Sequence, residues 1–238
     1  MILRPALYMI PVGISDAPLD DVIPAGNIDI IRGISHFIVE NVRTARRFLK
    51  RCDKNIDIDA LTFYELNGHT QELNIASFLE PLRSGLPVGM MSEAGCPGVA
   101  DPGAQVAAIA QREGFRVVPL AGPSSILMSL MASGFNGQGF AFNGYLPIEN
   151  DKRIKALKEL ENRAYRLSQT QIFIETPYRN AKFFEFLTAH LRPETLLCVA
   201  SQITDPEAES IITRSVAQWK KHPAQLTKMP AIFLISKP

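Results

Sequence analysis

Short apolar segments alternate with longer amphipathic segments along most of this sequence. The short segments have the length of strands, and several of the longer ones carry apolar residues at helical spacing. We expect strands over residues 7–10, 37–40, 62–65, 88–92, 116–120, 172–175, 196–201 and 231–235. We expect helices at about 43–54, 71–85, 102–113, 123–133, 151–168 and 178–191. This alternation is typical of an α/β protein.

The length of 238 residues suits one large α/β domain or two small ones. The glycine-rich stretch 134–139 could connect two halves, although a loop inside one domain could look the same. Hydrophobic residues make up 46% of the chain, which excludes a largely disordered protein. With a net charge of only +1, the protein as a whole does not attract nucleic acid or anionic membranes. Binding of a polyanion would therefore need a local basic patch.

The cysteines and histidines are too scattered for a disulfide framework or a zinc site. The three cysteines form no CxxC pair, which favours a reducing compartment. The histidines never fall at i, i+4 or beside a cysteine at zinc-ligand spacing, so we expect no metal. No apolar run approaches the ~20 residues that span a bilayer, and the N-terminus lacks the features of a signal peptide. We therefore expect a soluble cytoplasmic protein without a membrane partner.

The clearest local unit runs from Leu86 to Leu120. A buried strand is expected at 88–91, then a glycine-rich loop, then a helix that Asp101 caps and that starts at Pro102. The next strand follows almost at once, so the segment is a βαβ unit. Its loop 92–101 lies at the carboxyl end of a strand, where open α/β sheets bind ligands.

The loop 92–101 carries neither standard nucleotide fingerprint. It holds two acids, Glu93 and Asp101, and no base follows until Arg112, which disfavours a di- or triphosphate. It suits a ligand with hydroxyl, ammonium or sulfonium groups. The alternative is a crossover turn in which Asp101 only caps a helix, and the pattern leaves both open.

A second loop, 121–125, precedes a helix that is apolar on nearly every side. We expect this helix to be buried, with Ser129 and Ser133 bonding back to its own carbonyls. Ser124 and Ser125 either face a ligand shared with the loop 92–101 or simply cap the helix.

Four segments in matching order resemble one family. Residues 89–103, Gly-Met-Met-Ser-Glu-Ala-Gly-Cys-Pro-Gly-Val-Ala-Asp-Pro-Gly, are similar to the SDAGTPxxxDPG signature of the ribosomal RNA small-subunit methyltransferase I group, within the tetrapyrrole methylase superfamily. Residues 117–125 resemble its VVPLPGPSA segment, 142–147 its FxGFLP and 172–179 its FYESPHR. The resemblance implies an S-adenosylmethionine-dependent methyltransferase, built of two α/β domains with a cofactor cleft between them and assembled as a homodimer. We place the domains at 1–121 and 122–238.

The resemblance also assigns cofactor-binding positions, residue by residue. In the first domain and the start of the second these are Pro11, Gly13, Ser92, Glu93, Ala94, Val99, Ala100, Ser124 and Ser125. Further along the second domain they are Thr176, Ala200 and Ala231.

The chain departs from the group at several positions. The first loop, 10–18, loses the Asn-Leu of the group, and Glu93 and Cys96 replace an aspartate and a threonine in the main signature. The group's AEDTR reads Val-Glu-Asn-Val-Arg at 39–43. The chain ends soon after its last expected strand, where full-length members carry a helical extension. These changes bear on the substrate more than on the cofactor.

A ribose hydroxyl is a poor nucleophile when neutral, so a general base would help its methylation. Glu40, with Arg43 to orient it or to bind phosphate, is the first candidate, and Glu175 is the second. For either glutamate the alternative is an ion pair at a domain edge. We expect Cys96 to be a packed turn residue, because no histidine is near it in sequence.

The expected helix 43–54 has one strongly basic face. The bases lie at helical spacing: Arg43, Arg46, Arg47, Lys50, Arg51 and Lys54. The opposite stripe is Val42, Ala45, Leu49 and Cys52. Such a face could lie along an RNA backbone, although many basic helix faces bind nothing.

Three functions fit these features. The first, which we favour, is 2′-O-methylation of ribose in ribosomal RNA of the small subunit. The second is methylation of a tetrapyrrole or another small molecule. The third is a degenerate member that binds the cofactor or a partner without activity.

Overall fold

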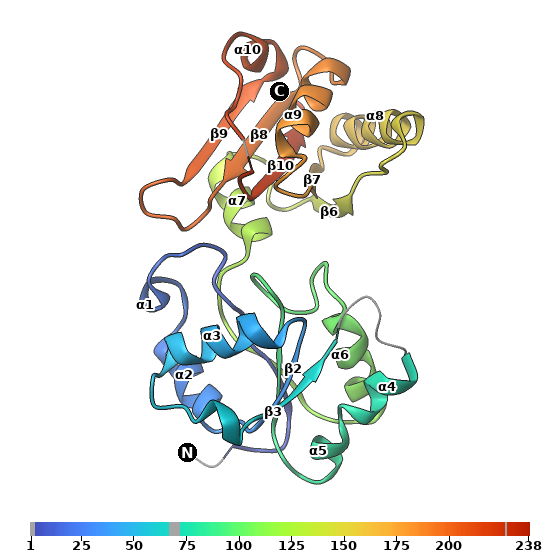
Figure 1. Cartoon of the computed structure of the whole chain (residues 1–238). Coiled ribbons are helices and arrows are strands. Elements are labelled where there is room, and N and C mark those ends of the chain that lie inside the picture. The colour runs from blue at the N-terminus through green and yellow to red at the C-terminus, as the bar shows by residue number, and fades with distance from the viewer. Residues whose placement is uncertain (1–2, 67–71, 227) are drawn as a thin grey trace. The chain divides into compact units, whose positions relative to one another are not determined.

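The protein folds into two compact units, Met1–Ser124 and Ser125–Pro238. The computed structural model, drawn in Figure 1, describes residues 3–66, 72–226 and 228–238. Each unit contains one sheet and several helices, which confirms the α/β class. The predicted boundary between residues 121 and 122 lies close to this division, and as a domain boundary it stays a prediction.

The first unit is built on a wholly parallel sheet. Its strands are β1 (Leu7–Met9), β2 (His36–Val39), β3 (Thr62–Glu65), β4 (Val88–Met91) and β5 (Val117–Pro119). Their spatial order is β3-β2-β4-β1-β5, and every neighbouring pair runs parallel. The carboxyl ends of β2, β4, β1 and β5 therefore lie side by side at one edge of the sheet.

Helices cover both faces of this sheet, as the strand alternation requires. They are α1 (Leu19–Val22), α2 (Ala25–Arg32), α3 (Val42–Cys52), the 3₁₀ helix η1 (Ile58–Ala60), α4 (Glu72–Ser77), α5 (Glu80–Arg83) and α6 (Gly103–Arg112). Phe37 of β2 packs in one cluster with Leu49 of α3. Its neighbour Ile38 packs in a second cluster with Leu82 of α5 and Val106 of α6.

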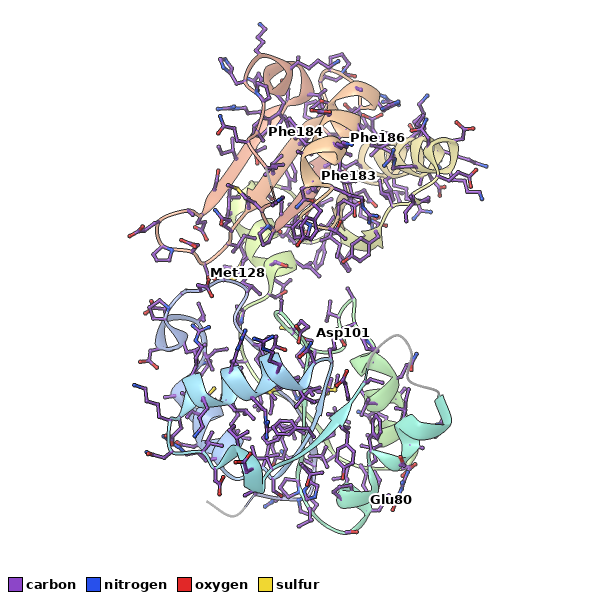
Figure 2. The ribbon with its side chains drawn as sticks, in the orientation of Figure 1. Glu80, Asp101, Met128, Phe183, Phe184 and Phe186 are labelled. Carbon is purple, nitrogen blue, oxygen red and sulfur yellow. The ribbon has the colours of Figure 1, made fainter. Side chains whose placement is uncertain are left out.

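The second unit has a mixed sheet of β6 (Phe140–Tyr145), β7 (Thr170–Ile174), β8 (Leu196–Ser201), β9 (Ser210–Ser215) and β10 (Ala231–Ser236). The order is β6-β7-β10-β8-β9, and only the β6–β7 pair is parallel. Its helices are α7 (Ser125–Ser133), α8 (Asn150–Leu167), α9 (Asn180–His190) and α10 (Val216–Lys221). The aromatic side chains of α9 labelled in Figure 2 pack into the core, where Phe183 meets Phe233 and Phe184 meets Trp219.

The burial predicted for α7 is wrong. Met131 is 82% exposed, whereas Leu130 is buried, so only one side of the helix packs against β9 and β10. The predicted serine bonds are confirmed: the hydroxyls of Ser129 and Ser133 donate to the carbonyls of Ile126 and Leu130. An apolar composition thus does not bury a helix that lies on the outer surface of a sheet.

Every expected strand is present, and most expected helices keep their bounds. The expected helix 71–85 divides into α4 and α5, and its first residue, Gln71, lies outside the described residues. Among the helices that the structure describes, none has the length and the apolar character needed to cross a membrane.

Candidate functional site

Three loops meet at the carboxyl edge of the first sheet because β4, β1 and β5 are neighbours. The Val12 N–H donates to the Gly95 carbonyl at 3.0 Å, which joins the loop after β1 to the loop after β4. Gly122, in the loop after β5, lies so close to Pro11 that a Cβ there would collide with the proline ring. The structure therefore brings together the predicted residues of segments 11–13, 92–100 and 121–124.

The loop after β4 is fixed by hydrogen bonds to Asp101, which is labelled in Figure 2. Both carboxylate oxygens accept the Gly98 N–H, at 2.8 and 2.9 Å, and one also accepts the Gly103 N–H at 2.6 Å. These bonds stabilise Ala100 in the left-handed region, at φ +62°, which costs about 1–3 kcal/mol for a residue with a Cβ. The predicted cap is one residue off: α6 begins at Gly103 and Pro102 occupies the cap.

Glu40 and Glu93 lie side by side because β2 and β4 are adjacent. The Glu93 N–H donates to Glu40 Oε1 at 3.1 Å, and the Thr44 hydroxyl donates to Glu93 Oε1. Burial raises the pKa of the Glu40 carboxyl, the Glu93 N–H opposes this, and the charges of Asp101 and Glu93 raise it further. The net result is a carboxyl group whose pKa is shifted upward, toward the range of a general base.

Arg43 does not contact Glu40 through any hydrogen bond or ion pair that the structure describes. Its backbone N–H instead donates to the side chain of Asn41, which caps α3 through Arg43 and Thr44. Asparagine caps a helix as well as aspartate does. The replacement of the family's aspartate by Asn41 therefore keeps the start of α3 in place.

Cys96 is a packed turn residue, as the sequence predicts. Its thiol donates to the Pro123 carbonyl at 3.5 Å, and burial raises the pKa of the thiol. A raised pKa reduces the thiolate fraction, which is the reactive form.

The basic face of α3 is only partly neutralised. Arg46 pairs with the exposed Asp59 at 3.0 Å, and Arg51 donates to the Ala17 carbonyl. Arg47 and Lys54 are exposed and take part in no ion pair among the described residues. The opposite stripe is confirmed: Ala45, Leu49 and Cys52 are buried, and Val42 packs against the same core. Phe48, which lies outside the predicted stripe, is also buried there.

In the second unit the predicted residues lie at or near strand ends. Thr176 follows β7, Ala200 lies within β8, and Ala231 opens β10, where Ile232 pairs with Ala200. Ser125 is the first residue of α7.

The carboxylate of Glu175 is largely buried and forms hydrogen bonds within the protein. Its Oε1 accepts the Thr176 N–H and an Arg179 N–H, each at 2.6 Å, and its side chain is 7% exposed. Glu175 is therefore part of an ion pair with Arg179, which was the alternative to a role as general base. Glu40 remains as the candidate base.

Within the described ranges 3–66, 72–226 and 228–238 there is no group of three or more histidine, cysteine, aspartate or glutamate side chains that could hold a metal ion.

Comparison with known proteins relates this chain to one set of curated sequences. No family model matches it. A protein of Vibrio cholerae named ribosomal RNA small subunit methyltransferase I is 29% identical over 84% of this chain and 65% of its own length. Proteins of the same name from Mesorhizobium japonicum and Leptospira biflexa are 32% and 26% identical, over 85% and 88% of this chain and 65% and 82% of their own lengths. The chain thus spans just under two thirds of the Vibrio and Mesorhizobium relatives.

Two solved structures share the fold. The methyltransferase CobJ has a TM-score of 0.64 and 17% identity, with 98% of this chain and 94% of that chain covered. A uroporphyrin-III C-methyltransferase from Thermus thermophilus, complexed with S-adenosylhomocysteine, has a TM-score of 0.59 and 14% identity, with 97% of each chain covered. At these identities the likeness shows the fold alone.

Proposed function

We propose that this chain is an S-adenosylmethionine-dependent methyltransferase of the tetrapyrrole methylase superfamily, because it is similar to curated proteins named ribosomal RNA small subunit methyltransferase I and shares its fold with two solved methyltransferases. Its proposed acceptor is the 2′-hydroxyl of a ribose in small-subunit ribosomal RNA. The observation that carries the proposal is the junction of three loops at the carboxyl edge of the first sheet, since these loops hold the residues that the family resemblance assigns to the cofactor.

The acidic side chains at the carboxyl edge of the first sheet fit the cofactor. Glu40 and Glu93 are acidic, and the loop 92–101 contains no basic side chain, which suits an ammonium and a sulfonium group. The residues proposed to hold the cofactor are those assigned by the resemblance: Pro11, Gly13, Ser92, Glu93, Ala94, Val99, Ala100, Ser124, Ser125, Thr176, Ala200 and Ala231. When bound, S-adenosylmethionine supplies an activated methyl group.

The chemical task of the protein is then to align the acceptor and to remove its proton. We assign the removal of the proton to the Glu40 carboxylate, whose Oε1 is fixed by the Glu93 N–H. Arg43 is proposed to bind an RNA phosphate, since it is exposed and, among the described residues, has no hydrogen bond or ion pair with Glu40. If the protein holds the acceptor hydroxyl in line with the methyl group, the reaction no longer depends on a bimolecular encounter in the right orientation.

Two other functions remain as alternatives. Methylation of a tetrapyrrole is the activity in the name of one structural neighbour, a uroporphyrin-III C-methyltransferase, but that likeness shows the fold alone and the function gives no role to the basic face of α3. The third function, an inactive member that only binds the cofactor or a partner, is suggested by the replacement of the group's Asp-Thr pair at residues 41 and 42. Asn41 nevertheless still caps α3, which weakens this argument.

Calorimetric titration with S-adenosylhomocysteine tests the cofactor assignment. Micromolar binding at about one ligand per chain is expected. Methyl transfer is then measured on small ribosomal subunits and, separately, on a uroporphyrin-type tetrapyrrole. No detectable heat and no rise in melting temperature at millimolar ligand would refute the assignment. Methylation of the tetrapyrrole alone would select the second function.

The basic face of α3 is expected to bind phosphates of the RNA. The double variant Arg47→Gln/Lys54→Gln should flatten the dependence of log K on log salt by about 1.4, because each phosphate contact on single strands contributes about 0.7. Fluorescence anisotropy with a labelled single-stranded RNA over a salt series measures this slope. The matched control, Lys155→Gln/Lys158→Gln, removes two exposed lysines from α8. An equal slope for both double variants would remove α3 from the RNA surface.

We also propose, from the family resemblance, that the protein is a homodimer that acts in the cytoplasm. Light scattering should give twice the chain mass of 26.3 kDa, and a monomer at micromolar concentration would contradict the proposal.

A further inference from the structure

Two exposed tyrosines lie at the same end of the second sheet. Tyr145 is the last residue of β6 and pairs in register with Ile174, the last residue of β7. Tyr178 follows Ile174 in the turn that leaves β7. Because β6 and β7 run parallel, both tyrosines belong to the carboxyl end of this strand pair. Thr176, a proposed cofactor residue, lies in the same turn.

We propose that Tyr145 and Tyr178 bind unpaired bases of the RNA substrate by stacking. This inference rests on the proposed RNA methyltransferase function and adds a surface of the second unit that receives unpaired bases of the substrate. Sequence-tolerant binding of single-stranded RNA commonly uses aromatic rings on which bases stack.

The exposure of these rings sets them apart from the other tyrosines. Tyr178 is 81% exposed and Tyr145 is 55% exposed. By contrast, Tyr8 is buried in the first unit, and Tyr165 lies under the guanidinium of Arg192 at 4.6 Å. Within the described residues, neither Tyr145 nor Tyr178 has a ring contact or a hydrogen bond from its hydroxyl. Their faces are therefore open to a ligand.

The turn that carries Tyr178 is fixed by several hydrogen bonds. Glu175 accepts hydrogen bonds from the Thr176 N–H and the Arg179 side chain, and the Arg179 and Asn180 N–H groups donate to the Thr176 carbonyl. The Asn180 side chain donates to the Met229 carbonyl at 2.6 Å, which fixes the start of α9 to the segment before β10. The backbone of such a turn needs no further ordering when a base stacks on the ring.

The charges beside Tyr178 favour a nucleic acid over an apolar protein surface. Arg179 keeps 45% of its side chain exposed, and Lys182, one helical turn beyond Tyr178, is exposed and makes no ion pair among the described residues. An aromatic ring flanked by cations matches the alternation of base and phosphate along a single strand. We therefore assign this surface to RNA.

The test is RNA binding by Tyr178→Ala, Tyr145→Ala and the double variant. The probe is a single-stranded RNA 12-mer that carries one 2-aminopurine, whose fluorescence is quenched when it stacks. We expect each single variant to weaken binding by about tenfold and the double variant to abolish the quenching. Tyr178→Phe, which keeps the ring, should bind like the wild type.

Phe140→Ala is the matched control, because Phe140 is an exposed aromatic residue at the opposite, amino end of β6. Titration with S-adenosylhomocysteine and the melting temperature report whether each variant is folded and keeps its cofactor site. Light scattering reports whether the tyrosines instead support contacts between chains.

The outcomes separate this inference from the proposed function. A wild-type protein that binds S-adenosylhomocysteine but neither binds the RNA nor methylates ribosomal subunits would overturn both. A wild type that binds RNA, with folded alanine variants that bind it equally well, would overturn only the stacking surface. Alanine variants that change the chain's association state and leave RNA affinity intact would overturn it in favour of a protein interface.

Discussion

Glu40→Gln should slow methyl transfer by about 10²–10⁴-fold while S-adenosylhomocysteine affinity and melting temperature stay close to those of the wild type. Glutamine keeps the oxygen that accepts the Glu93 N–H, so the turn after β2 should be preserved. It cannot accept a proton from the ribose hydroxyl. A single-turnover assay on small ribosomal subunits, at saturating cofactor, measures the chemical step.

The dependence of this rate on pH is a second readout of the same assignment. Burial and the neighbouring carboxylates raise the pKa of Glu40 above the ordinary value of 4.5. A base acts in its deprotonated form, so the wild-type rate should rise as pH increases through this raised pKa and then level off. Glu40→Gln should lose that limb of the profile.

A matched substitution separates charge loss from loss of the base. Glu159→Gln removes an exposed carboxylate that pairs with Arg163 on α8, and it should leave the rate unchanged. If Glu40→Gln turns over at the wild-type rate, Glu40 is not the base. If it fails to bind S-adenosylhomocysteine, its role lies in holding the cofactor.

Sequence patterns predicted those parts of the fold in which local signals agree. The unit from 86 to 120 combines an apolar run, turn formers and a helical stripe, and the structure reproduces it as β4, α6 and β5. The helices α1 and α2 were missed because Pro18, Pro24 and Gly26 interrupt any apolar period between residues 17 and 32. The strands β6 and β9 were missed because both lie at sheet edges and carry polar residues.

The site could be predicted only in part, because contacts between loops depend on strand order. Nothing local in the sequence indicates that β1 lies between β4 and β5, so the junction of Val12 with Gly95 and of Pro11 with Gly122 needed the fold. The family resemblance supplied the residues but not their contacts. The bond from Thr44 to Glu93 was missed for the same reason, since it joins α3 to the loop after β4.

Asp101→Ala is expected to have the largest effect on the cofactor site. The substitution leaves the Gly98 and Gly103 N–H groups without their acceptor, and an unsatisfied buried donor costs about 1–3 kcal/mol. The melting temperature should fall by about 5–10 °C, since about 1 kcal/mol shifts it by 2–4 °C in a chain of this size. Ala100 would lose the bonds that favour its left-handed conformation, and the loop 92–101 should relax away from its geometry.

This loop carries five of the proposed cofactor residues, so its relaxation should weaken S-adenosylhomocysteine binding by more than tenfold. Asp57→Ala is the matched control, since Asp57 accepts a single N–H, from Asp59, at an exposed turn of the same unit. The control should melt and bind nearly as the wild type does. If Asp101→Ala loses stability but keeps the affinity, the loop does not contact the ligand, and the cofactor assignment for residues 92–100 is wrong. If it loses affinity as expected, a local carboxylate sets the shape of a loop that the sequence could only identify by resemblance.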